Sequence, residues 1–209
     1  MADFYLASHS PRRRELLRQI GARFETLLLR SAAPRGPDIS ESQRAGEPAA
    51  DYVVRVAREK AERGVQALAS RSLLLKPVLG ADTVVVVDGD ILPKPQDARQ
   101  AARFLERLSG RSHEVRTAVA LAMPRAPSGQ HHGVGIAVSA TLVTMRTLDP
   151  VEIQNYCASG EPFDKAGGYA IQGRAAIFIE RIEGSYSGVV GLPLAETAFL
   201  LGQAGVRLL

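Results

Sequence analysis

The sequence predicts an α/β fold, a single domain over residues 1–209 in which helices flank a mixed, twisted sheet. Two observations carry this prediction. Short runs rich in β-branched and aromatic residues alternate with amphipathic helical segments, a pattern typical of proteins whose strands and helices share one core. The chain also contains no internal repeat and no linker-like stretch, so nothing in the sequence divides it into separate domains.

The N-terminal part begins with a short strand followed by a helix with clear end signals. Ser10 suits an N-cap, Pro11 the first helical position and Gly21 the C-terminal stop. The next stretches are a second strand, a surface loop rich in Pro, Gly, Ser and charge, and a second helix. The predicted bounds are strand 4–6, helix 11–20, strand 24–29, loop 31–48 and helix 51–64.

The remaining two thirds alternate in the same way. Asp88-Gly89 is a two-residue hairpin signal, Gln96-Asp97 caps a helix, and Asp149-Pro150 begins another with the pattern of a capping box. The predicted elements are strands 78–87 and 90–93, helix 98–108, strand 115–121, loop 123–133, strand 134–148, helix 150–158, loop 160–173, strand 176–182, loop 183–188 and helix 193–204.

The composition is that of a soluble globular protein, with 45% hydrophobic and 23% charged residues. No apolar stretch approaches the ~18 residues of a membrane span, and the start lacks a signal-peptide pattern. The single cysteine, Cys157, excludes an intramolecular disulfide and fits a reducing compartment. We therefore expect a cytoplasmic protein without membrane association.

Basic residues are in excess, and the kind of cation is informative. The net charge of +4 is scattered, only 5% of residues are aromatic, and no basic tail is present, so we expect a small anionic ligand rather than nucleic acid. Of 26 basic residues only four are lysines, and a compact ammonium suits a phosphate. Three of them, Lys60, Lys94 and Lys165, fall in candidate sites, and Lys76 falls in a predicted loop.

The first helix places Arg12, Arg13 and Arg14 in its first turn. Cations there oppose the helix dipole by roughly 0.3–1 kcal/mol each, whereas the backbone N–H groups at that end form an anion site. A bound phosphate would turn the repulsion into an attraction. Arg13 shares the helical phase of the apolar stripe and is predicted to face inward, whereas Arg14 lies on the opposite face with Arg18. A basic surface helix is the alternative, and the inward position of Arg13 favours the phosphate site.

Two further residues of opposite charge interrupt apolar patterns. Lys60 continues the inward stripe of the second helix, where a lysine either extends to solvent or meets an anion. Asp82 lies in a valine-rich strand, which is costly unless it has a partner or a metal. If the hairpin ladder continues outward from its turn, Asp82 lies within a residue of Lys94. A structural ion pair is one explanation, and metal-assisted attack on a phosphate ester or anhydride is the favoured one.

Two loops add candidate ligands. Glu41 by itself is typical of a solvated residue, and together with Asp82 it would suit Mg²⁺, which takes one or two protein carboxylates with phosphates and water. The glycine-rich loop over 160–173 suggests close approach of backbone to a ligand, with Lys165 for charge and Gln172 for a base edge. The phosphate loop, dinucleotide turn and nucleophile-elbow motifs are absent.

Taken in order, these segments resemble the Maf family of nucleoside triphosphate pyrophosphatases. Asp-Lys-Ala-Gly at 164–167 and Ile-Gln-Gly at 171–173 resemble the dTTP/UTP branch rather than the 7-methyl-GTP branch. Two positions depart from the pattern, His9 where a small residue is usual and Ser40 where an acid is frequent. The matching pieces span nearly the whole chain, at 6–13, 57–61, 79–84, 94–95, 109–110, 164–167, 171–173 and 191–194.

The resemblance implies a fold similar to inosine triphosphate pyrophosphatases, and hydrolysis of dTTP and UTP, with modified pyrimidine nucleotides as further candidates. The products would be the monophosphate and pyrophosphate, and the cofactor Mg²⁺ or Mn²⁺. It makes Asp82 the general base and, with Glu41, the metal ligand. Substrate would be bound by Ser10, Arg12, Arg13, Lys60, Thr83, Lys94, Lys165 and Gln172, of which Arg12, Thr83 and Gln172 match positions tied to base choice. Whether the chain forms a homodimer is left open by the sequence. The alternative function is a nucleotide-binding regulator of cell division that acts by contact.

Overall fold

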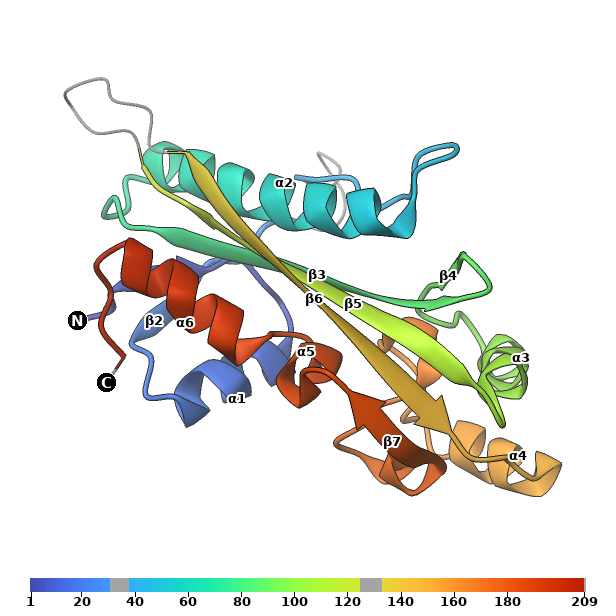
Figure 1. Cartoon of the computed structure of the whole chain (residues 1–209). Coiled ribbons are helices and arrows are strands. Elements are labelled where there is room, and N and C mark those ends of the chain that lie inside the picture. The colour runs from blue at the N-terminus through green and yellow to red at the C-terminus, as the bar shows by residue number, and fades with distance from the viewer. Residues whose placement is uncertain (31–37, 125–132, 209) are drawn as a thin grey trace. The chain divides into compact units, whose positions relative to one another are not determined.

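The computed structural model describes residues 1–30, 38–124 and 133–208 and contains a seven-stranded mixed sheet (Figure 1). Its strands are β1 (Phe4–Leu6), β2 (Phe24–Thr26), β3 (Val78–Val87), β4 (Asp90–Leu92), β5 (Ser112–Ala122), β6 (Val134–Met145) and β7 (Ile179–Glu183). Their hydrogen-bonded order is β2-β1-β3-β5-β6-β7, with β4 paired to β3. Pairing of β1 with β2 and β3 is parallel, whereas β4 and β7 pair antiparallel with β3 and β6. The predicted α/β class with a mixed sheet is confirmed.

Helices alternate with these strands, and α1, α3 and α4 begin at the predicted caps. The helices are α1 (Pro11–Gln19), α2 (Ala49–Ser70), α3 (Ala98–Leu108), α4 (Pro150–Ala158), α5 (Tyr186–Val190) and α6 (Leu194–Gln203), with short 3₁₀ helices η1 (Ala166–Gly168) and η2 (Arg174–Phe178). Ser10 and Asp97 accept bonds from backbone N–H groups of α1 and α3, and Asp149 forms a capping box with Glu152. None of the helices in the described ranges has the length and apolar character needed to cross a membrane.

The chain folds into two compact units. Unit 1 comprises residues 1–82, 118–138 and 191–209, and unit 2 comprises residues 83–117 and 139–190. The residues of β3, β5 and β6 are divided between the units. The single domain over residues 1–209 stays a prediction.

In unit 1, α2 lies close against the first half of β3 (Figure 1). A Cβ atom at Gly80 would lie 2.5 Å from the carbonyl oxygen of Ala57 and 2.7 Å from the nitrogen of Ala61, both backbone atoms of α2. Only glycine permits this approach. On α2 the contact at Ala61 is next to Lys60, and on β3 Gly80 is two residues before Asp82. The close approach of helix and strand therefore brings the Lys60 and Asp82 side chains together.

Unit 2 contains its own hydrophobic core between the β3–β4 hairpin and the helices α3 and α4. The hairpin turns at Asp88 and Gly89, whose φ angles are +54° and +83°. Positive φ at both central positions is the geometry of the predicted two-residue turn. The register pairs Val87 with Asp90 and Val86 with Ile91, as expected from the sequence.

Several element bounds differ from the prediction for local physical reasons. Helix α2 continues past Gly64 to Ser70, because this glycine lies against Val78, where an added Cβ would come within 2.5 Å of the valine side chain. The predicted strand over 176–182 begins as the 3₁₀ helix η2, whose first N–H groups bond to Glu161. A helix, α5, occupies part of the predicted loop 183–188, since Ser185 Oγ accepts the Gly188 N–H. Strands β2 and β6 end before 29 and 148. The predicted loops 31–48 and 123–133 lie partly outside the described residues.

Candidate functional site

Unit 1 brings one ammonium group and two carboxylates together. Lys60 Nζ lies 2.9 Å from Asp82 Oδ1 and 3.2 Å from Glu41 Oε1. Lys60 and Asp82 are 9% and 7% exposed, whereas the Glu41 side chain is about half exposed. Helix α2 supplies the lysine, β3 the aspartate, and the segment before α2 the glutamate. A buried carboxylate and a buried ammonium stabilise each other only when paired, as they are here.

The hairpin ladder on which the predicted neighbour of Asp82 depended is shorter than expected. Asp82 was expected to lie within a residue of Lys94 if the ladder continued outward from its turn, but the ladder ends at Leu92. Lys94 itself is exposed. Proline at both neighbours of Lys94, residues 93 and 95, removes the N–H groups that would extend the ladder. Lys60, for which burial against an anion and extension to solvent were both open, points inward and meets carboxylates.

Arg13 faces inward as predicted and is 8% exposed. Its Nε donates to the Gly191 carbonyl oxygen at 2.8 Å, and Nη1 donates to the Ala81 carbonyl oxygen at 2.7 Å. Burial lowers the pKa of Arg13, and the charges of Asp82 and Glu41 act in the opposite direction. The guanidinium therefore fastens the residue next to Asp82 to the segment before α6, and it brings positive charge to the two carboxylates.

The other predicted residues of α1 surround its N-terminus. Ser10 Oγ accepts the Arg13 N–H at 3.4 Å, and the Ser10 N–H donates to Ser8 Oγ at 3.1 Å. Arg12 is half-buried in the first turn. Arg14 donates to the His9 carbonyl oxygen at the surface, at 3.3 Å, on the face away from the core as predicted.

Unit 2 holds the remaining predicted substrate residues. Thr83 Oγ1 lies 2.9 Å from Oγ1 of the fully buried Thr117, which lies 2.7 Å from the Gly188 carbonyl oxygen. Lys165 Nζ donates to the Phe163 carbonyl oxygen at 3.3 Å. Gln172 is exposed in a turn. The contact of Thr117 with Thr83 gave no signal in the sequence, because it joins residues of different strands.

Glu161 holds the ends of the glycine-rich loop together. Its carboxylate accepts from Tyr156 Oη at 3.0 Å and from the backbone N–H groups of Arg174 and Ala175 at 3.0 and 3.3 Å. A Cβ at Gly173 would lie 2.5 Å from this carboxylate. The sequence predicted that the backbone of this loop approaches a ligand closely. At Gly173 the group that it approaches is the Glu161 carboxylate.

Sequence analysis did not single out the two residues of α2 that contact the Glu41 segment. Tyr52 Oη donates to the Glu41 carbonyl oxygen at 2.8 Å, and Arg55 contacts the residues on either side of Glu41. Burial raises the pKa of Tyr52, and the charges of Asp82 and Glu41 raise it further. The spacing of Arg55 and Glu59 indicates an ion pair on one helix face, but it says nothing of the segment before the helix.

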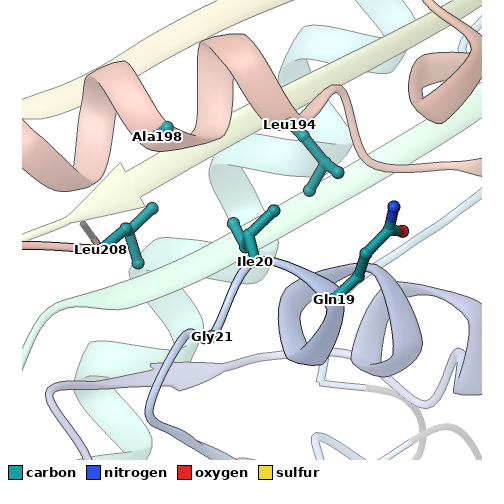
Figure 2. Close-up of a pocket in the computed structure, with 6 residues that line it drawn as sticks. All are labelled: Gln19, Ile20, Gly21, Leu194, Ala198 and Leu208. Carbon is teal, nitrogen blue, oxygen red and sulfur yellow. The ribbon is translucent and has the colours of Figure 1, made fainter.

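A cavity of about 520 Å³ lies elsewhere in unit 1, beside the end of α1 and the start of α6 (Figure 2). Its lining is mostly aliphatic, and Gln19 contributes an amide. It contains none of the predicted site residues and no ionisable side chain, so its lining offers no acid or base. The lining residues are Gln19, Ile20, Gly21, Leu194, Ala198 and Leu208.

The donor set fits a hard divalent cation. In the described part of the chain no three His, Cys, Asp or Glu side chains gather into a metal-binding group. The carboxylates that come together in unit 1 are those of Glu41 and Asp82. Both lie within hydrogen-bonding distance of one atom, Lys60 Nζ. Two carboxylates completed by phosphate oxygens and water are typical of Mg²⁺.

Comparisons with known proteins place this arrangement in context. A family profile described as Maf-like protein matches residues 3–204. The chain is 53% identical to a dTTP/UTP pyrophosphatase of Nitrosomonas europaea over 97% of this chain and 94% of the relative. It is 55% identical to a protein of the same name from Bordetella parapertussis, over 97% and 92%.

Among solved structures, the Staphylococcus aureus Ham1 protein matches with a TM-score of 0.41 and 13% identity, over 68% of this chain and 71% of that one. A similarity this low supports no argument about fold or function. The likeness to inosine triphosphate pyrophosphatases therefore stays an expectation.

Proposed function

Because the chain belongs to the Maf family, we propose that it is a nucleoside triphosphate pyrophosphatase that hydrolyses dTTP and UTP to the monophosphate and pyrophosphate. The observation that carries the proposal is the contact of Lys60 with both Asp82 and Glu41, beside the buried Arg13. Hydrolysis of a phosphoanhydride needs a base for water and positive charge for the phosphates. These residues supply both.

In this proposal Asp82 accepts the proton of the attacking water. The water oxygen forms a bond to the α phosphorus while the bond from this phosphorus to the oxygen that bridges to the β phosphate breaks. Pyrophosphate leaves with the bridging oxygen. Arg12, Arg13, Lys60 and Lys94 stabilise the charge that develops on the phosphate oxygens. Lys60 also touches the carboxylate of Asp82 directly, at 2.9 Å, and so fixes the orientation of the base.

Asp82 and Glu41 would hold a divalent cation, Mg²⁺ or Mn²⁺, together with the substrate. When bound, the cation would neutralise negative charge on the triphosphate. Both carboxylates reach the position of Lys60 Nζ, so a cation bound beside it would contact both of them.

We assign selectivity for the nucleobase of the substrate to Gln172, together with Thr83 and Arg12. A glutamine amide offers one donor and one acceptor, and thymine and uracil present an acceptor–donor–acceptor edge that matches it. Cytosine replaces one acceptor with an amino donor. An unpaired buried polar group costs about 1–3 kcal/mol, which corresponds to roughly tenfold or greater discrimination. Gln172 is exposed in the structure, so its amide is accessible to a base.

The test is kcat/KM for dTTP, UTP, CTP, ATP, GTP and 7-methyl-GTP with Mg²⁺ or Mn²⁺, with pyrophosphate measured as product. We expect dTTP and UTP to be the best substrates and Gln172→Ala to reduce their advantage over CTP by roughly tenfold. Gln203→Ala, which removes an exposed amide at the end of α6, is the matched control and should keep the wild-type preference.

Two outcomes would redirect the assignment. CTP or 7-methyl-GTP as the best wild-type substrate contradicts the dTTP/UTP preference while leaving the reaction class intact. Nucleotide binding without turnover, measured by calorimetry, favours the regulator of cell division instead.

A further inference from the structure

Three successive backbone carbonyl groups in the segment before α2 are held by two side chains of that helix. Arg55 Nη1 donates to the Ser40 carbonyl oxygen at 3.3 Å, and Nη2 donates to that of Ser42 at 3.0 Å. Between them, Tyr52 Oη donates to the Glu41 carbonyl oxygen at 2.8 Å. Tyr52 and Arg55 are three residues apart and so lie on one face of the helix.

Arg55 is itself fixed in place. Its Nε and Nη2 donate to the two carboxylate oxygens of Glu47 at 2.6 and 2.9 Å, a bidentate pair. The two side chains are only 13% and 10% exposed, unlike the mobile surface pairs that contribute little. The guanidinium also lies 5.4 Å from the centre of the Tyr52 ring. Hydrogen bonding from Arg55 lowers the pKa of Glu47 to about 2, so the pair stays ionised at neutral pH.

The consequence falls on Glu41. Its side chain is about half exposed and belongs to a segment without regular structure, yet its carboxylate lies 3.2 Å from Lys60 Nζ. The backbone on both sides of Glu41 is bonded to α2, the helix that carries Lys60. The bond to residue 40 is made by its backbone carbonyl and therefore does not depend on the side chain at that position.

We propose that Arg55, assisted by Tyr52, is a positioning residue that holds Glu41 beside Asp82 and thereby shapes the divalent-cation site. The inference rests on the proposed function for the role of the two carboxylates. Arg55 acts through the segment 40–42 and not on the substrate. Its removal should therefore weaken cation binding while the chemical step at saturating cation stays close to wild type.

The experiment compares Arg55→Ala, Arg55→Lys and Tyr52→Phe. Arg63→Ala is the matched control, because Arg63 also joins α2 to the preceding segment, at Asp38, which Arg30 holds as well. Three quantities are measured: the Kd for Mn²⁺ alone by electron paramagnetic resonance, amide hydrogen exchange over residues 38–48, and the Mg²⁺ dependence of UTP hydrolysis.

For Arg55→Ala we expect the Mn²⁺ Kd and the Mg²⁺ half-saturation to rise about 10–100-fold, the range typical of residues that orient metal ligands. Exchange over 38–48 should accelerate, and kcat at saturating Mg²⁺ should remain within about threefold of wild type. Arg55→Lys, which keeps the charge and loses the bidentate contact, should fall between Arg55→Ala and wild type. Tyr52→Phe should show the same changes in smaller size, and Arg63→Ala should behave as wild type.

Several results would overturn the inference. These are a folded Arg55→Ala protein with wild-type Mn²⁺ affinity or wild-type exchange over 38–48, an equal effect of Arg63→Ala, or a wild-type protein that binds no Mn²⁺. If Arg55→Ala does not fold, Tyr52→Phe, which removes a single oxygen, decides by the same measurements. A wild-type protein that binds Mn²⁺ without hydrolysing UTP contradicts the proposed function alone, and the binding and exchange data still decide the role of Arg55.

Discussion

Lys60 Nζ and Asp82 Oδ1 lie 2.9 Å apart, although the two residues are separated by 22 positions in the chain. The pair is buried, and Glu41 also contacts the lysine, so one ammonium group touches two carboxylates. Removing one member of a buried pair leaves the other uncompensated, which is costly. For any substitution of these residues, the free energy of unfolding therefore has to be measured as well as the activity.

Asp82→Asn should abolish most of the activity and leave the fold intact. Asparagine keeps the shape and a hydrogen-bond acceptor for Lys60, and Glu41 still balances the lysine charge. Loss of a general base typically lowers the rate by ~10²–10⁴. The measurement is kcat for UTP together with the thermal unfolding midpoint. A folded variant that keeps more than about a third of the wild-type kcat would contradict the assignment of Asp82 as base.

Arg13→Ala and Arg14→Ala should differ sharply although the residues are neighbours. Arg13 satisfies the buried carbonyl groups of Ala81 and Gly191, so its loss should lower the free energy of unfolding by about 2–4 kcal/mol. It should also raise KM for UTP, since its charge faces the site. Arg14→Ala should change stability by less than about 0.5 kcal/mol. Denaturant unfolding and steady-state kinetics check both, and equal effects of the two substitutions would rule out the inward role of Arg13.

Gly80→Ala should separate α2 from β3. The added methyl group would lie 2.5 and 2.7 Å from backbone atoms of α2 and 3.0 Å from the Cβ of Lys60, so the helix has to shift. We expect a loss of about 1–3 kcal/mol in the free energy of unfolding and a fall in kcat/KM, because Lys60 moves away from Asp82.

Gly202→Ala is the control for Gly80→Ala. Among the described residues, nothing lies within 4 Å of a Cβ at Gly202 in α6. Alanine there should raise stability by about 0.5–1 kcal/mol without affecting kcat/KM. Wild-type stability and activity in Gly80→Ala would show that the contact between helix and strand is not needed for the site.

Unit 2 contains a buried histidine that should make the fold sensitive to mild acid. His113 is 2% exposed, and its Nε2 lies 2.6 Å from Tyr169 Oη. Burial lowers the pKa of His113 to about 4, from about 6.5 in an unfolded chain. Between these values the unfolded chain takes up a proton that the folded protein does not. Stability is therefore highest above pH ~6.5 and falls as the pH drops towards ~4, by up to about 3 kcal/mol.

Unfolding measured from pH 7 to 4.5 tests this prediction, with His113→Gln as the comparison because glutamine does not titrate. Glu47 and Glu152 do not interfere in this range. Arg55 and Arg146 lower their pKa values to about 2, so the stability that these carboxylates provide is lost only as the pH falls below ~4.5. We expect a flatter profile for the variant. The same slope in both proteins would exclude His113 as the cause.

Local chemistry in the sequence determined much of this protein. Ser10, Asp97 and Asp149 cap helices wherever they were expected, because a cap depends only on a side chain and the next three N–H groups. Asp88-Gly89 set the hairpin register for the same reason. Helical phase also predicted that Arg13 faces inward, since the direction of a helical side chain follows from its position among apolar neighbours. It placed Lys60 on the apolar stripe of α2 and left open whether its ammonium group meets an anion or extends to solvent.

The choice of partners was decided only by the tertiary structure. Asp82 pairs with Lys60, because Gly80 lets α2 approach β3. The ladder that was expected to lead towards Lys94 ends at Leu92, beside two prolines. Neither the closeness of that approach nor the hold of Arg55 on the Glu41 segment appears in any periodicity. Such contacts join residues far apart in the chain, and their distances depend on how whole elements pack.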